Sequence, residues 1–235
     1  MKYLNNKEGM QDADDAEDAV KSTVRLEQQM EALEDRLREL PNDASAEERL
    51  KLELHRAAIL VDLDRMSEGY ALARREFDKA IAVEEWEQAV VACDIMFNAD
   101  HDETLPALGQ GIWLAVTYPI DPELSVALLE HVIDETPDDS DGAALAATAA
   151  RYIVDLRAEG KMKEDLEFFT NNMLGTVARR HSNVQTQDEF DIWIKKLKLN
   201  DPAQFLPRLR NVVDVMVQDS WWFDREALQE KLPLN

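Results

Sequence analysis

The chain has 235 residues, of which 45% are hydrophobic and 32% are charged, and its formal net charge at pH 7 is -23. This is the composition of a globular protein, and such an acidic balance disfavours direct binding to nucleic-acid phosphates or to anionic lipid. The single cysteine, Cys93, excludes an intramolecular disulfide and any zinc or iron–sulfur site that one chain builds from several cysteines.

The start of the chain, MKYLNNKEGMQDADDAEDAV, lacks the apolar core of a signal peptide, and no later run of about 18 apolar residues is present to span a bilayer. We therefore expect a cytoplasmic protein that does not bind membranes. Glycine and proline are few and alternating apolar patterns are absent, which predicts an all-α fold of about nine or ten helices. The expected architecture is an N-terminal helical hairpin followed by stacked antiparallel hairpins, arranged as an α-solenoid or as an irregular helical bundle.

Charge and helix breaks divide the chain into four parts. Residues 1–160 hold 37 of the 49 acidic residues and 15 of the 26 basic ones, whereas residues 161–235 hold 12 and 11. The predicted parts are a disordered N-terminus (1–12), a coiled-coil-like helical hairpin (13–66), acidic helical hairpins (67–160) and a neutral C-terminal helical region with an aromatic tail (161–235).

The first helical hairpin is recognised by an apolar seam. Leucine and methionine recur every three or four positions from Leu26 to Leu40, Ala19 and Thr23 continue the pattern backwards, and Pro41 interrupts it. A capping box at Ser45 and Glu48 starts a second helix, which is predicted to continue past Met66. The seam is expected to pair within this hairpin, and a homodimer through residues 19–40 is the alternative.

One stretch of the acidic part has the spacing of a helical repeat. Lys79–Phe97, KAIAVEEWEQAVVACDIMF, places Trp86 three residues before Ala89, and apolar residues follow every three or four positions. The next helical pair ends at Thr136-Pro137. In these features about residues 70–137 resemble the tetratricopeptide repeat family, in which a closing proline often ends the second helix.

The resemblance implies pairs of antiparallel helices that stack side by side, with a concave face on which a peptide can bind. Phe77 and Trp113 depart from the pattern, because the family has a small residue where its helices cross closely. The second turn between helices is also rebuilt, as Pro119-Ile120-Asp121-Pro122. No ligand-binding residue of the family is carried over.

Further helices are predicted over 140–159, at the end of the acidic part, and over 162–179, 187–198 and the stretch after Pro202 in the C-terminal part, with a short helix near the end. The tail of the C-terminal part contains Trp221, Trp222 and Phe223 in succession, and three consecutive side chains cannot all face one core in a regular helix. They are predicted either to pack on the last helices or to anchor a partner.

The distribution of carboxylates suggests the function. Between Lys79 and Arg151 there are 15 carboxylates and no Lys or Arg. Because such a surface repels itself, a cationic partner is favoured. We expect a non-enzymatic interaction scaffold or assembly chaperone for a basic protein or peptide, with contacts from these candidate residues: Glu84, Glu85, Glu87, Asp138, Asp139, Asp141, Trp221, Trp222 and Phe223.

Two other function classes are open. A helical metal- or cofactor-handling protein or enzyme would use the polar cluster Asp100–Glu103, and an acidic inhibitor that mimics nucleic acid would occupy a DNA-binding protein. The sequence has no HExxH, no Glu-x-x-His, no nucleotide-binding glycine loop and no calcium loop, so neither a catalytic residue, a metal ligand nor a cofactor is assigned. Cys93 has apolar neighbours and is expected to be a buried structural thiol.

Overall fold

The computed structural model describes residues 15–99 and 103–232, with side chains from residue 22 onward. Within these ranges the protein has eleven helices and no strand, which confirms the predicted all-α class. The helices are α1 (Asp15–Glu39), α2 (Ala46–Asp62), α3 (Met66–Ala82), α4 (Trp86–Asn98), α5 (Thr104–Thr117), α6 (Pro122–Glu135), α7 (Asp141–Arg157), α8 (Gly160–Ser182), α9 (Gln187–Lys196), α10 (Pro202–Val217) and α11 (Arg225–Gln229). The predicted disorder of residues 1–12 lies outside the described residues.

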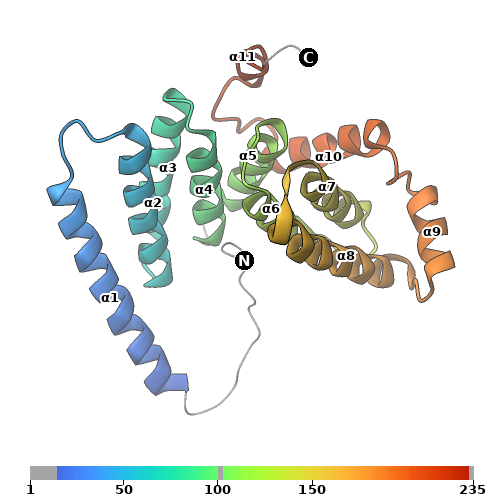
Figure 1. Cartoon of the computed structure of the whole chain (residues 1–235), viewed down its shortest axis with the longest axis horizontal. Coiled ribbons are helices and arrows are strands. Elements are labelled where there is room, and N and C mark those ends of the chain that lie inside the picture. Colours follow the sequence, from blue (N-terminus) through green and yellow to red (C-terminus); the bar gives the residue numbers. More distant parts are fainter. Residues whose placement is uncertain (1–14, 100–102, 233–235) are drawn as a thin grey trace.

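The helices from α1 to α9 pack mainly on their neighbours in the chain. Each contacts the next one, and α1 and α9 lie at the two ends of the molecule (Figure 1). The helices α2, α4, α6 and α8 also contact one another in that order, so they form one row. The helix α10 instead returns and packs across α5 and α7. None of the described helices combines the length and the apolar character that crossing a membrane requires.

Four turns between helices use the left-handed backbone conformation, at Asp64 (φ 60°), Glu84 (φ 61°), Asn183 (φ 52°) and Lys198 (φ 55°). In each turn, backbone N–H groups donate to the last carbonyl groups of the preceding helix, which ends the helix and reverses the chain. The prediction that the second helix continues past Met66 is therefore wrong. That helix ends at Asp62 because Asp64 adopts this conformation, and α3 begins at Met66.

The predicted helix starts are confirmed by their caps. The carboxylate of Asp121 accepts from the backbone N–H of Glu123 at 2.8 Å, and Asp201 caps α10 in the same way before Pro202. Thr186 and Glu189 form a complete capping box. Each cap satisfies a backbone donor that would otherwise have no partner in the first turn.

The apolar seam of α1 packs on its own chain. Met30 and Leu33 are buried, and Leu26, Leu37 and Leu40 pack at the edge of the core. These five residues form one apolar stripe. The contact of α1 is with α2, as the hairpin prediction requires. A homodimer through residues 19–40 stays a prediction.

The central part of the helix α5 is enclosed on all sides. It has no charged residue, and every side chain from Ala107 to Ala115 is buried. Two glycines permit its close contacts: a Cβ atom on Gly109 would lie 2.6 Å from Val217 of α10, and one on Gly111 would lie 2.6 Å from Leu128 of α6. Because a stretch of helix that is apolar on all sides needs cover on all sides, α4, α6 and α10 pack around this central part.

Arginines from the second half of the chain cap the C-terminal ends of other helices. Arg157 donates to the carbonyl oxygens of Ala115 (2.7 Å) and Val116 (3.1 Å) at the end of α5. Arg180 reaches the end of α6 in the same way, and Arg208 donates to the carbonyl after α9. Since the last carbonyls of a helix have no partner within it, these contacts satisfy buried acceptors and favour a positive charge there. Burial lowers the pKa of Arg157.

The packing at α5 gives a test by substitution. Gly111→Ala would place a Cβ atom 2.7 Å from the Cβ of Cys93, which cannot move without its helix. We expect it to lower the free energy of unfolding by about 1–3 kcal/mol in urea denaturation, because overpacking strains a filled core.

The matched control for Gly111→Ala is Gly175→Ala in α8. An added Cβ there would lie 3.5 Å from the nearest atom, in ordinary contact. This variant should be more stable by about 0.5–1 kcal/mol, because alanine is the better helix former. Equal stability of the two variants would contradict the close packing of α5.

Candidate interaction surfaces

The six carboxylates that the sequence singled out form two separate groups. Glu84, Glu85 and Glu87 lie at the turn between α3 and α4, whereas Asp138, Asp139 and Asp141 lie at the turn between α6 and α7. Consecutive helices joined by short turns run antiparallel, so the first turn follows an odd-numbered helix and the second follows an even-numbered one. The two groups are therefore at opposite ends of the helices and do not make one surface.

The first group has cationic neighbours from distant parts of the chain. Glu84 pairs with Lys231 at 2.6 Å, although 147 positions separate them. Lys51 of α2 pairs with Glu47, and this hydrogen bond, with smaller contributions from Glu87 and Glu85, raises the pKa of the Lys51 ammonium. The carboxylates of this turn thus lie near positive charges that the local sequence does not contain.

The second group is paired with the C-terminal region. Asp141 contacts the guanidinium of Arg208 at 2.7 Å and the imidazole of His181 at 3.2 Å. Asp138 lies 3.8 Å from Arg180, and Asp139 is exposed. Basic side chains of the C-terminal region therefore offset part of the negative charge of the segment that contains no Lys or Arg. Sequence reasoning missed these partners because none of them is close in the chain.

A third acidic group, which the sequence did not single out, lies where α4 meets α6. We call Asp94, Glu130 and Asp134 the α4–α6 acidic face. Asp94 lies on α4, and Glu130 and Asp134 are one helical turn apart on α6. His131 joins the two helices, because its Nε2 atom lies 3.0 Å from the carboxylate of Asp94. Neither α4 nor α6 contains a Lys or Arg.

The imidazole of His131 is also held by an aromatic contact, with its ring 4.5 Å from the ring of Phe97. This contact and the Asp94 carboxylate fix the ring between the two helices. Two features of the sequence mark this face: the lack of Lys and Arg between Lys79 and Arg151, and the Glu130–Asp134 pair, whose like charges repel each other four positions apart on a helix.

The electrostatics of Glu130 reflect this repulsion. Burial, and then the negative charge of Asp134, raise the pKa of the Glu130 carboxyl group, while His131 opposes the shift. Because the pKa in the folded state is higher than in the unfolded state, the ionised form destabilises the fold. The penalty is fully present above the folded-state pKa and disappears as the pH falls below that of an unfolded glutamate, about 4.3.

Glu130→Gln should therefore stabilise the protein at neutral pH. We expect a gain in the free energy of unfolding of less than about 1 kcal/mol, since water screens a partly exposed group. The gain should vanish in urea denaturation below about pH 4. A gain that is the same at pH 7 and at low pH would contradict the raised pKa, and Glu164→Gln on the exposed side of α8 is the control substitution.

The aromatic tail packs on the body of the protein. The ring of Trp222 lies 5.3 Å from Phe77 of α3 in an edge-to-face arrangement, and the ring of Phe223 lies 5.2 Å from Trp113 of α5. Trp221 also meets Trp113 edge-to-face, at 6.3 Å. Each of the three tail aromatics is only partly buried. Phe77 and Trp113, the two large residues that depart from the repeat pattern, are thus the residues that receive the tail.

Polar contacts fix the path of the tail. The buried side chain of Gln110 accepts the backbone N–H of Trp222 at 2.8 Å, and the hydroxyl of Tyr118 donates to the carbonyl of Leu228 at 3.1 Å. The guanidinium of Arg74 lies 4.2 Å from the centre of the Trp222 ring, in a cation–π contact. Sequence reasoning could not assign these contacts, because Gln110 and Trp222 are 112 positions apart.

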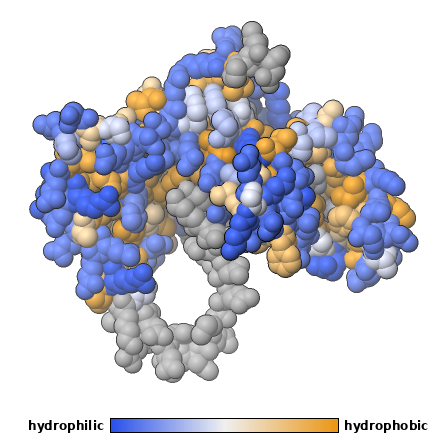
Figure 2. Space-filling view, viewed as in Figure 1, coloured by the Kyte–Doolittle hydropathy of each residue, from blue (hydrophilic) through white to orange (hydrophobic). Residues whose placement is uncertain are grey.

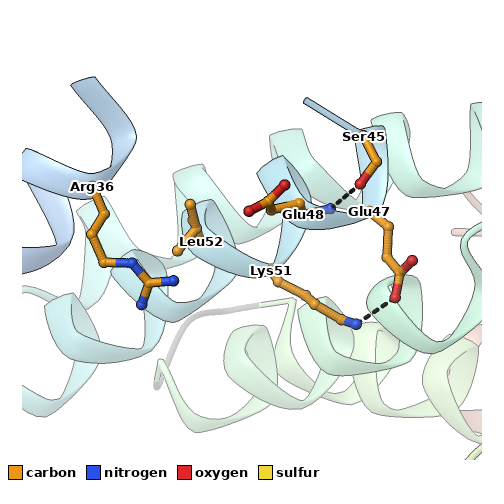
Figure 3. A pocket seen from close by; sticks show the side chains of 6 residues that line it. All are labelled: Arg36, Ser45, Glu47, Glu48, Lys51 and Leu52. Atoms are coloured by element: carbon orange, nitrogen blue, oxygen red, sulfur yellow. Dashed lines mark hydrogen bonds and ion pairs between the residues drawn. The ribbon is translucent and has the colours of Figure 1, made fainter. Parts of the chain in front are cut away.

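Two hollows of about 260 Å³ each lie near the N-terminal hairpin. Figure 3 shows the first, where Arg36 reaches from α1 toward the start of α2. There Ser45 accepts the backbone N–H of Glu48, and Glu47 pairs with Lys51. The second hollow is lined by Ala46, Arg49, Leu50, Glu76, Lys79, Ala82 and Val83. Each hollow contains an ion pair that offsets part of its charge. In the first it is Glu47 with Lys51, and in the second the buried Glu76 pairs with Lys79 and also with Arg75.

The polar cluster proposed for metal binding is only partly visible. Asp100, His101 and Asp102 lie outside the described residues, and Glu103 accepts a hydrogen bond from the hydroxyl of Tyr70 at 3.0 Å. Among the residues with described positions, no group of three or more His, Cys, Asp or Glu side chains is arranged to hold a metal ion. Cys93 is buried as predicted, and burial raises the pKa of its thiol.

Hydrophilic residues cover most of the face seen in Figure 2, and hydrophobic residues show in patches between the helices.

Comparison of the chain with models of protein families, with curated proteins and with solved structures found no match. The likeness of residues 70–137 to tetratricopeptide repeats therefore stays a prediction.

Proposed function

We propose that this protein is a non-enzymatic interaction protein, a scaffold or assembly chaperone, that binds a basic protein or peptide on the α4–α6 acidic face. The observation that carries the proposal is that the carboxylates of this face lie on two contacting helices that contain no Lys or Arg. A basic partner would bring the counter-charge that these helices lack. The gain would be largest where carboxylates repel one another, as Glu130 and Asp134 do.

The other candidate carboxylates are weaker choices for this role. Glu84, Asp138 and Asp141 have cationic partners within the chain, so a basic ligand would have to displace those partners. Glu85 and Asp139 extend the available acidic surface at the two ends of the helices. Stacked helical hairpins are a common support for peptide binding, and this supports an interaction role. The proposal includes a cytoplasmic location, which rests on the sequence.

The proposal is tested by charge reversal at the α4–α6 acidic face. The double variant Glu130→Lys, Asp134→Lys should bind a lysine-rich peptide at least about tenfold more weakly at low salt, measured by calorimetry, because attraction becomes repulsion. The loss should shrink as salt is added, since salt screens charges at the surface.

The matched control is Glu164→Lys, Asp165→Lys on the exposed side of α8, which changes the net charge by the same amount. We expect this variant to bind the peptide almost as well as the unmodified chain. Equal weakening in both double variants would mean that only the total charge matters, and unchanged binding in both would mean that the acidic face has no role. Circular dichroism of both variants shows that the helices are intact.

A further inference from the structure

Residues 219–232, the C-terminal segment, leave the body of the protein at a strained hinge. Gln218 follows α10 with φ 51° and ψ -124°, a backbone conformation that residues with a Cβ atom rarely adopt. Its N–H donates to the carbonyl of Asp214 at 2.8 Å, and Arg225 folds back to pair with the Asp214 carboxylate at 2.5 Å. The hinge is therefore a sharp reversal that the contacts of the segment must hold in place.

Apart from the Arg225–Asp214 pair, the contacts that hold the segment lie on a surface ahead of α10 in the chain. Phe77 and Trp113 meet its aromatic rings, Gln110 and Tyr118 bind its backbone, and Glu84 pairs with its lysine. We call these five residues the receiving surface. These five residues could make the same contacts with a segment that is joined to the α10 of a second copy of the chain.

The segment is bound shallowly for its number of aromatic residues. Leu228 is its one residue with a buried side chain within the described part of the chain, at 6% exposure, and Trp221, Trp222 and Phe223 all keep access to solvent. Release of the segment would leave the contacts of α10 with α5 and α7 in place. Detachment is thus a local event rather than the unfolding of the protein.

We propose that two copies of this chain exchange their C-terminal segments, so that the receiving surface of each copy holds Trp221, Trp222 and Phe223 of the other. The occupant is a second copy because the surface already fits this sequence. The closed monomer and the exchanged dimer make the same contacts at the receiving surface. They differ in the hinge, since an extended hinge releases the strain at Gln218, and in the entropy of association.

This exchange has a consequence beyond the proposed function. The dimer is two-fold symmetric and carries two α4–α6 acidic faces, so a partner with two basic segments would bind more tightly by avidity. The exchange itself does not depend on that function, because it involves none of the residues of the acidic face. A failure of either proposal therefore leaves the other standing.

Isotope mixing tests the exchange directly. Full-length chains labelled with ¹⁴N and with ¹⁵N are mixed, concentrated and separated by size with light-scattering detection. A carbodiimide then joins the Lys231 amine to the Glu84 carboxylate as an amide, with loss of water, and mass spectrometry reads the isotopes of the two peptides. We expect a dimer that grows with concentration and contains crosslinks between a ¹⁴N and a ¹⁵N peptide.

Gln218→Gly gives the second measurement. Glycine adopts the hinge conformation without strain, so the closed monomer gains stability and dimerisation should weaken by at least about tenfold. The exposed control Gln229→Gly lies in the segment but outside the hinge and should not favour the monomer in this way. The proposal is overturned by a monomer at every concentration, by a dimer with Glu84–Lys231 crosslinks of one isotope only, or by unchanged dimerisation of Gln218→Gly.

Discussion

A stretch of helix that is apolar all round is stable in water when other elements cover it, and Ala107 to Ala115 of α5 form such a stretch. Its neighbours in the chain, α4 and α6, cover part of its surface, and α10 covers a further part from about 100 positions away. This need explains why the chain turns back after α9 rather than continuing outward. The return of α10 also brings the aromatic tail to Phe77 and Trp113, and the receiving surface follows from the same constraint.

The return of the chain also changes the electrostatics. The net charge of the C-terminal region is close to zero, but its basic side chains do not pair only with its own carboxylates. Arg180, Arg208 and Lys231 reach the acidic turns of the first two thirds of the chain, and Arg157 and Arg180 cap the ends of α5 and α6. The acidic character is thereby reduced at the ends of the helices, whereas α4 and α6 contain no Lys or Arg of their own. That contrast is the physical basis for proposing the α4–α6 face as the site of a basic partner.

The sequence predicted what depends on nearby residues. The caps at Asp121, Asp201 and Thr186 were predictable because a cap needs a short polar side chain at one position, and the seam of α1 was predictable from its spacing. The end of α2 could not be predicted, because it depends on the left-handed conformation of Asp64. Aspartate tolerates this conformation, but its presence in a sequence does not indicate it. The ion pairs of Asp141 and the contact between Gln110 and Trp222 join distant residues, and periodicity carries no information about such partners.

The central claim is that α10 and the tail are required to keep α5 enclosed. Amide hydrogen exchange, read by mass spectrometry, compares the full chain with one that ends at residue 200. The account predicts that the amides of α5 exchange much faster in the shortened chain while those of α2 keep their protection. Equal protection of α5 in both chains would contradict it, because the helix would then be covered without the C-terminal region.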